Sequence, residues 1–323
     1  MRSDGGPLRL SDAMPPIQPL TSASKAKADT ISAVKVMYLH GAEQRSAAEA
    51  ERDVMIGLRR GLLKAGMSGR IESFEVHTAY YGDLLATAGP GVCFRGRDET
   101  RKIAPESSGE VVCPCCRQGS GYQLYQGVHR AIGTPRTLVG LIVDAGIRDV
   151  RRYAGDDGVR QRVQHRVIDH LRHHQPDVVI AHSLGTVVLV DVLGQIEPGA
   201  GPSIIVTAGS PLGRPGLFSV PTDWQQNASL QLWLNLVDPT DEITGARRLG
   251  QPDFKSVINY IVDNDHYSSW WGEDGGFFAT HSLRHYLTHP VTAWLLTEFG
   301  RGEEAQTLTQ RIREYAPPAV DDR

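Results

Sequence analysis

One serine of this sequence stands where a chain could expose a nucleophile. The apolar residues 178–181 lead through His182 to Ser183, and small residues, Ala181 and Gly185, lie two positions to either side. This spacing is typical of a strand–turn–helix element that presents a serine hydroxyl above a parallel sheet. Such a hydroxyl attacks a carbonyl group only when a nearby base takes its proton. The sequence must therefore also supply a base, an acid that orients the base, and donors for an oxyanion.

The residues on both sides of Ser183 fit a tight turn. The usual pattern is G-x-S-x-G, and Ala181 replaces its first glycine. Alanine has the smallest side chain after glycine, so we expect the turn to tolerate it. Residues 186–195 are apolar and suit a buried helix, although their valines would also allow a strand. The alternative interpretation is a surface serine in an ordinary β-to-α turn, because short motifs recur by chance.

The elements that must position this serine predict an α/β fold. Apolar, β-rich segments and segments with helical spacing alternate along the chain, the former at 31–40, 71–80, 203–207 and 230–237 and the latter at 47–65 and 159–174. Alternation of this kind is typical of a parallel sheet with helices on both faces. Functional residues of such sheets gather where the strands end. The strand ends that we expect at this edge carry His40-Gly41, Ser183, Ser210 and Asp241.

Together these segments resemble the α/β-hydrolase superfamily, in particular its lipase- and esterase-like branch. The resemblance covers about residues 34–297 and is carried by residues 38–41, the A-H-S-L-G segment at Ser183, and residues 207–211 and 234–241. It implies the α/β-hydrolase fold with a mostly parallel central sheet. It also implies that the nucleophile, the acid and the histidine follow one another in that order along the chain.

The resemblance gives Ser183 the role of the nucleophile and offers two acids. In the family the acid usually lies a few residues beyond its strand, which favours Asp241 over Asp238. Asp238 could instead accept hydrogen bonds from the turn backbone, as aspartate often does before proline. The backbone N–H groups of Ala42 and Leu184 are the expected donors of the oxyanion hole.

The base has to come later in the chain. Family members often place the histidine in a loop shortly before a tyrosine and a closing helix, which favours His281. His266 is the alternative. His285 and His289 are more typical of a helix face and a helix end.

The composition limits the possible partners. The chain has 323 residues, a net charge of −3, 22% charged and 40% hydrophobic residues, which argues against nucleic acid as the main partner. No apolar run approaches the roughly 20 residues that span a bilayer. Residues 1–30 lack the apolar core of a secretory signal, so a cytoplasmic location is expected. We expect a small-molecule acyl substrate and no cofactor, and the sequence does not indicate an oligomeric state.

The domain organisation follows from where the patterns begin and end. We expect a flexible tail over residues 1–30, one α/β-hydrolase domain over 31–300 and a C-terminal tail over 301–323. Residues 82–140 are rich in glycine, proline and charged residues. A stretch of this length without regular patterning predicts an inserted loop or lid.

The cysteines raise the question of a metal. Cys93 stands alone, whereas Cys113, Cys115 and Cys116 cluster. Four thiolates could bind zinc, but structural zinc sites use paired C-x2-C spacing, which is absent. Reduced thiols in a loop are the favoured interpretation, and a disulfide is a further alternative. The sequence therefore predicts no metal site.

The expected reaction is hydrolysis of a carboxylic ester, of a lipid or a small acyl compound. It would use a Ser-His-Asp triad and an acyl-enzyme intermediate. The same residues can cleave thioesters and amides, so a thioesterase or a peptidase or amidase remains an alternative. A binding module that keeps the hydrolase fold without catalysis is the remaining alternative.

Overall fold

The structure is a computed structural model of the 323-residue chain. It describes residues 33–41, 46–85, 149–150, 152–197, 199–213, 229–239, 241, 249, 257–262, 264 and 280–315. Ala42, His266, the four cysteines and nearly all of the expected insertion at 82–140 lie outside these residues.

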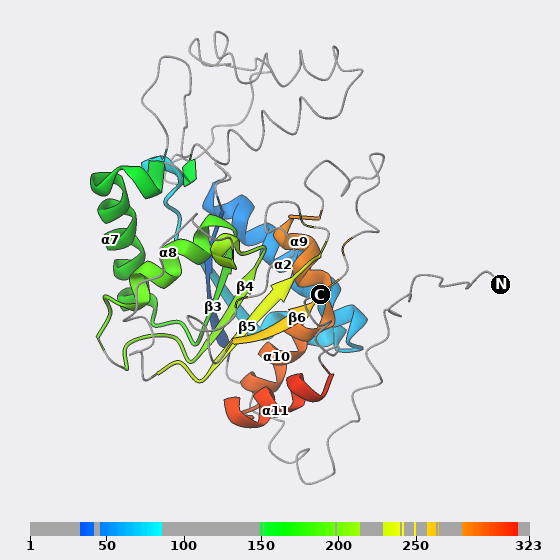
Figure 1. The fold of residues 1–323 in the computed structure, drawn as a ribbon. Coiled ribbons are helices and arrows are strands. Elements are labelled where there is room, and N and C mark those ends of the chain that lie inside the picture. Colours follow the sequence, from blue (N-terminus) through cyan, green and yellow to red (C-terminus); the bar gives the residue numbers. More distant parts are fainter. Residues whose placement is uncertain are drawn as a thin grey trace, which may run out of the picture.

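A parallel sheet forms the centre of the described chain (Figure 1). Its strands are β1 (Val34–Leu39), β2 (Phe74–Thr78), β3 (Val178–His182), β4 (Ile204–Ala208), β5 (Leu232–Val237) and β6 (Val257–Ile261). The order is β2-β1-β3-β4-β5-β6, and all neighbouring strands run parallel. Every residue of β3, β4 and β5 is buried, as expected for central strands that are covered on both faces.

Helices cover both faces of this sheet (Figure 1). They are α2 (Ala47–Lys64), α3 (Gly82–Leu85), α7 (Asp157–His174), α8 (Leu184–Leu193), α9 (Leu283–Thr288), α10 (Pro290–Gly300) and α11 (Ala305–Tyr315), with 3-10 turns η1 (Ser68–Ser73) and η2 (Pro211–Gly213). The predicted α/β class is confirmed, because the sheet is parallel and helices lie on both of its faces. Among the described helices, none combines the length and the apolar character that crossing a membrane requires.

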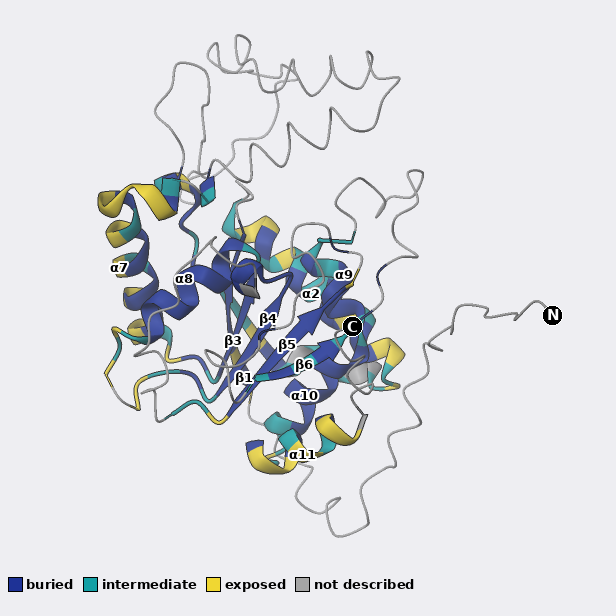
Figure 2. Cartoon of the chain, in the orientation of Figure 1, coloured by how far each residue is buried: buried dark blue, intermediate teal, exposed yellow. Residues whose placement is uncertain are grey.

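The sheet separates two hydrophobic cores. Alternate strand residues such as Val36 and Ile180 pack against α2, α9, α10 and α11. Their neighbours, such as Met37 and Val179, pack on the opposite face against α3, α7 and α8. In the cartoon of Figure 2 the strands and most of α8 and α10 are coloured as buried, whereas α7 and α11 also carry exposed residues. Because strand side chains alternate between faces, each strand contributes to both cores.

Local sequence fixes the ends of the longest helices. Ser46 and Glu49 form a capping box at the start of α2, in which each side chain bonds the backbone N–H of the other residue. The Asp156 carboxylate accepts from the Val159 N–H at the start of α7. Gln175 ends α7 in the left-handed conformation.

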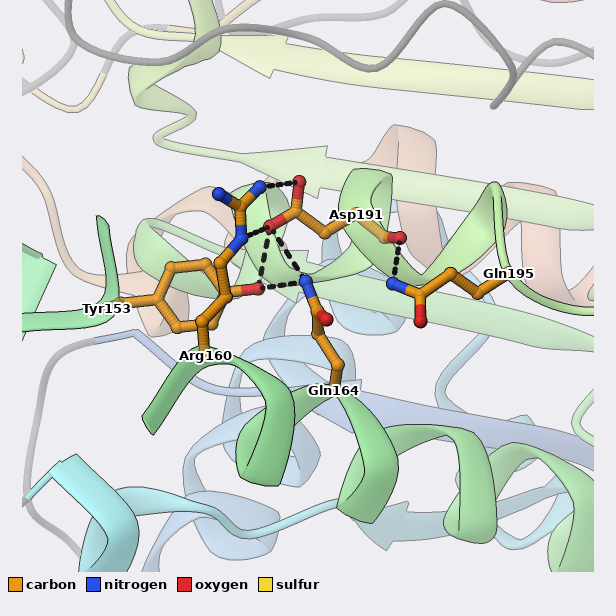
Figure 3. Close-up of polar contacts among 5 residues, drawn as sticks. All are labelled: Tyr153, Arg160, Gln164, Asp191 and Gln195. Carbon is orange, nitrogen blue, oxygen red and sulfur yellow. Dashed lines mark hydrogen bonds and ion pairs between the residues drawn. The ribbon is translucent and has the colours of Figure 1, made fainter. Parts of the chain in front are cut away.

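A buried carboxylate joins α7 to α8 (Figure 3). Asp191 of α8 accepts a bond of 2.7 Å from the Tyr153 hydroxyl and two from the Arg160 guanidinium, at 2.8 and 3.0 Å. The Gln164 amide donates to the same carboxylate at 3.3 Å. Asp191 is buried, so these donors compensate for a charge that has lost its water. The group holds in place the helix that begins directly after Ser183.

The C-terminal segment differs from the predicted tail. Within residues 301–323, α11 packs onto the sheet layer and buries Leu308 and Ile312. The guanidinium of Arg311 lies 4.7 Å from the centre of the Trp294 ring, a cation–π contact. The spacing of the apolar residues places them on one face of a helix, so the tail prediction is wrong for the residues of α11.

Candidate active site

The strand order reverses its direction between β1 and β3, which lie side by side in the sheet. β2, which follows β1 in the chain, lies on one side of β1, and the next strand, β3, lies on its other side. In parallel sheets such a switch point is where ligands bind, beyond the carboxyl ends of the strands. Gly41 follows β1 and Ser183 follows β3. A Cβ atom added to Gly41 would lie 2.9 Å from the Ser183 Cβ and 3.4 Å from its Oγ, so the two segments touch.

Ser183 is held in a strained turn between β3 and α8. Its φ of 52° and ψ of −125° lie in a region that non-glycine residues rarely adopt. Strain of this kind persists only where the surroundings enforce it, and it clusters at functional sites. A Cβ atom at Gly185 would overlap the carbonyl of Leu39, so this position requires glycine. Ala181 is a fully buried residue of β3, where a methyl group is accommodated.

Hydrogen bonds fix the backbone of this turn. The Ser183 N–H donates to the Ala208 carbonyl at 3.1 Å, which ties the turn to the end of β4. The Thr186 hydroxyl lies 2.7 Å from the Ser183 carbonyl, to which it donates, and 2.9 Å from the Ser210 hydroxyl. Ser210, one of the expected strand-end residues, therefore supports the turn.

His281 and Asp241 lie together, although 40 positions separate them in the sequence. His281 Nδ1 is 2.7 Å from Asp241 Oδ2, and the exposed fractions of the two side chains are 12% and 0%. The Tyr286 hydroxyl donates to the same Oδ2 atom at 2.7 Å. Burial is the main cause that raises the pKa of Tyr286 well above its ordinary value, with the Asp241 charge adding to it, so the hydroxyl keeps its proton. A carboxylate that accepts at Nδ1 selects the tautomer whose Nε2 is free to accept a proton.

Gly209 brings the His281 ring to the Ser183 side of the sheet edge. Its φ is +56°, and a Cβ atom there would lie 2.9 Å from His281 Cε1 and 3.0 Å from Nδ1. The imidazole therefore rests on a glycine backbone. The preceding residue, Ala208, is the one whose carbonyl accepts the Ser183 N–H.

His182 links the two halves of the site. Its Nε2 lies 2.6 Å from the carbonyl of His281 and must donate to it, because a carbonyl can only accept. The rings of His182 and His281 are 4.7 Å apart, centre to centre. The residue directly before the candidate nucleophile thus fixes the loop of the candidate base.

His40 supports the segment after β1. The Tyr81 N–H donates to His40 Nε2 at 3.1 Å, so the other nitrogen, Nδ1, carries the proton and donates to the Gly41 carbonyl at 2.7 Å. The Tyr81 hydroxyl donates to the His40 carbonyl, and the two rings stack with centres 4.2 Å apart. Burial lowers the pKa of His40 to about 4, so this imidazole is neutral near pH 7.

The remaining predicted residues divide into three groups. Leu184 is the first residue of α8, where an N–H has no acceptor within the helix. The Asp238 carboxylate accepts from the Asn264 N–H at 3.0 Å, a contact with backbone. Ala42, His266 and the candidate zinc ligands Cys93, Cys113, Cys115 and Cys116 lie outside the described residues.

Sequence reasoning missed several residues that shape this site. Tyr286, His182, Gly209 and Thr186 all contact a candidate catalytic residue or its backbone. Tyr286 had a signal, because a tyrosine shortly after the histidine was part of the pattern that favoured His281. The other three carry no local signal, since their contacts join segments distant in sequence or depend on the turn itself.

Comparisons with known proteins add little to this geometry. Neither a protein-family model nor a curated protein matches the chain. Among solved structures, the esterase domain of a Rhodothermus marinus protein is similar at 13% identity and a TM-score of 0.31, over 85% of this chain and 89% of that one. Likeness of this degree does not identify a reaction or a substrate.

Proposed function

We propose that this chain is a serine hydrolase that cleaves carboxylic esters, with Ser183 as nucleophile, His281 as base and Asp241 as the acid. The observation that carries the proposal is the pairing of a buried Asp241 carboxylate with His281 Nδ1 at 2.7 Å, beside a serine in a strained strand-to-helix turn. The mechanism needs a serine that is presented to substrate and a histidine that is oriented by a carboxylate. The strained turn supports the first of these and the contact with Asp241 supports the second.

In the first half-reaction the Ser183 Oγ attacks the ester carbonyl carbon. His281 Nε2 takes the hydroxyl proton, and Asp241 offsets the positive charge that develops on the imidazole. The tetrahedral intermediate then collapses, its bond to the alkoxy oxygen breaks, and the imidazolium gives its proton to the departing alcohol. The acyl group remains on Ser183 as an ester.

In the second half-reaction water repeats these steps. His281 takes a proton from the water as its oxygen attacks the acyl carbon, and the imidazolium returns a proton to Ser183 Oγ as that bond breaks. The products are the carboxylic acid and free enzyme. Because the base is used twice, loss of His281 slows both acylation and deacylation.

Two backbone amides would stabilise the oxyanion in both steps. The Leu184 N–H, at the start of α8, is one donor, and the positive end of the helix dipole lies there. The amide of Ala42 is the other, in the peptide unit whose Gly41 carbonyl accepts from His40. A preorganised donor of this kind contributes about 2.7–4 kcal/mol to the transition state.

The first test replaces the nucleophile. We expect Ser183→Ala to lower kcat for a short p-nitrophenyl ester by about four to six orders of magnitude, and to abolish labelling by a fluorophosphonate probe. Ser282→Ala is a matched control, because this serine adjoins His281 and its side chain caps no helix. Labelling of Ser183→Ala at the wild-type level would refute the assignment. An unlabelled wild-type protein would favour the non-catalytic binding module.

The second test decides between the alternative acids and bases. His281→Ala is compared with His266→Ala, and Asp241→Asn with Asp238→Asn, by kcat for the same ester. The proposal predicts that kcat falls at least about 10³-fold further in His281→Ala than in His266→Ala. The same difference is expected between Asp241→Asn and Asp238→Asn. The reverse order in either pair would move that role to the alternative residue.

The scissile bond is tested by substrate choice. The same triad can act on thioesters and amides, so matched ester, thioester and anilide compounds with one acyl group separate these activities. The proposal predicts the highest kcat/KM for the ester. A series of acyl chain lengths then defines the lipid or small-acyl character of the substrate.

A further inference from the structure

Three histidines that take no part in the proposed ester chemistry converge where α7 packs against the edge strand β2. They are His77 of β2, and His170 and His174 of α7. One ring nitrogen from each lies within 4.8 Å of those of the other two, and all three side chains are half-buried. Histidine, cysteine and acidic side chains are the usual protein ligands of metals. Among the described residues, these three histidines form the one group of such side chains that is close enough to hold a metal ion.

The fold brings these side chains together from two separate elements. β2 is an edge strand, and His77 pairs in register with Met37, which faces the α7 and α8 core. Neighbouring residues in a parallel register share a face, so His77 also faces α7, and its ring contacts those of His170 and His174. His170 and His174 are four positions apart and therefore lie one above the other on the same side of that helix.

The contacts within the group are close. His77 Nε2 lies 2.9 Å from His170 Nδ1, and the ring centres of His77 and His174 are 3.6 Å apart. Two imidazole nitrogens at this distance can share only one proton. With Zn–N bonds of about 2.0–2.1 Å, the nitrogens of a tetrahedral site are separated by about 3.3 Å, so small side-chain rotations would admit a metal between them.

We propose that His77, His170 and His174 bind a transition-metal dication, with zinc as the physiological ion and water completing the tetrahedron. Imidazole nitrogens suit zinc and neighbouring transition metals, whereas magnesium and calcium prefer oxygen ligands. The site is separate from the proposed serine chemistry, and no atom of the triad belongs to it.

The bound metal would stabilise the contact between α7 and the segment that follows β2. Arg166, four positions before His170 on α7, forms an ion pair with Asp83 and lies 3.4 Å from the Tyr80 carbonyl, to which it donates. Arg166, His170 and His174 thus form one stripe along the edge of the sheet. Because a metal that binds only the folded chain raises its stability, zinc should slow the separation of α7 from this edge.

The test uses the full-length chain without a histidine tag, freed of metal with a chelator. Zinc binding is measured by competition with a chromogenic chelator, and thermal unfolding with and without zinc. We expect saturable binding that is at least about tenfold weaker in His77→Gln and in His170→Gln, and an unfolding temperature that rises with zinc in wild type but not in these two variants. His165→Gln is the matched control, because His165 is an exposed histidine of the same helix.

A second measurement separates this site from the cysteines and from misfolding. The cobalt complex of wild type should show d–d absorption without a thiolate charge-transfer band, and the variants should keep the wild-type circular dichroism in chelator. Equal zinc affinity in wild type and His77→Gln would overturn the proposal. A thiolate band that survives in both histidine variants would also overturn it, because the metal would then be bound by cysteine.

Discussion

At the residue scale, one carboxylate oxygen organises the candidate site. Asp241 Oδ2 accepts from both His281 Nδ1 and the Tyr286 hydroxyl, each at 2.7 Å. Bonds to a charged acceptor in a buried setting are among the stronger ones in proteins. Tyr286 is therefore a positioning residue, which acts on the imidazole through the carboxylate.

Removing the Tyr286 hydroxyl tests that role. We expect Tyr286→Phe to lower kcat for the ester about tenfold with KM unchanged, if about 1.4 kcal/mol of the lost bond is expressed in the transition state. Tyr260→Phe, which alters a buried tyrosine of β6, should leave kcat unchanged. Equal losses in both variants would point to a general effect on the core and not to positioning.

His40 links the site to the pH dependence of stability. Its pKa is about 4 in the folded chain and 6.5 when unperturbed, so between these values the unfolded chain binds a proton that the folded chain does not. The free energy of unfolding therefore falls as the pH falls, by about 1.4 kcal/mol per pH unit from this group.

The measurement compares wild type with His40→Gln by urea unfolding from pH 7 to pH 4. The stability difference between the two proteins should change across this window by the amount expected for one proton, with wild type losing more on acidification. Parallel stability curves would show that His40 is not the group responsible.

At the scale of elements, α8 begins directly after Ser183, the proposed nucleophile, and Asp191 holds α8 to α7. Asp191→Ala would leave the Tyr153 hydroxyl, the Arg160 guanidinium and the Gln164 amide without their acceptor. We expect the free energy of unfolding to fall by about 2 kcal/mol, because the buried Tyr153 hydroxyl and Gln164 amide lose their acceptor, whereas Arg160, whose side chain is 33% exposed, can regain water. Gln195→Ala is the control, since that side chain bonds only the Asp191 backbone carbonyl and should cost about 1 kcal/mol or less.

The elements themselves were largely predictable from the sequence. Hydrophobic periodicity placed α2, α7 and the central strands, because each has a strong one-sided or fully apolar pattern. β6 was not predicted, although all of its residues except Asn259 favour strands and their burial alternates as in a strand. α11 was not predicted either, although Ala305, Leu308 and Ile312 have the spacing of one helix face.

The site was predictable only in part, for a physical reason. Ser183 has a local signature, since its turn imposes small neighbours on the same stretch of chain. The contact of His281 with Asp241 and the bond of His182 to the His281 carbonyl span 40 and 99 positions, and no local pattern encodes them. Asp241 was favoured over Asp238 by resemblance alone, and the structure adds the 2.7 Å contact.

At the scale of the whole molecule, the two cores meet at the site. Ser183 leads into α8, which belongs to the core on one face of the sheet, and His281 leads into α9, which belongs to the core on the other face. The proposed nucleophile and the proposed base are therefore supported by different layers. The sheet edge, through Gly209 and Ala208, is where their backbones come together.

Because of this division, the distance between Ser183 and His281 depends on how the two helical layers are aligned on the sheet. Leu189→Ala or Leu287→Ala would create a cavity in one of the two cores. The helices of that core could then shift slightly relative to the sheet to fill it. Proton transfer between the two residues tolerates far less displacement than the sheet does. Such a change lowers the free energy of unfolding by about 2–5 kcal/mol while unfolding stays cooperative, and turnover would decline further than this loss of stability explains, because the layers are no longer aligned.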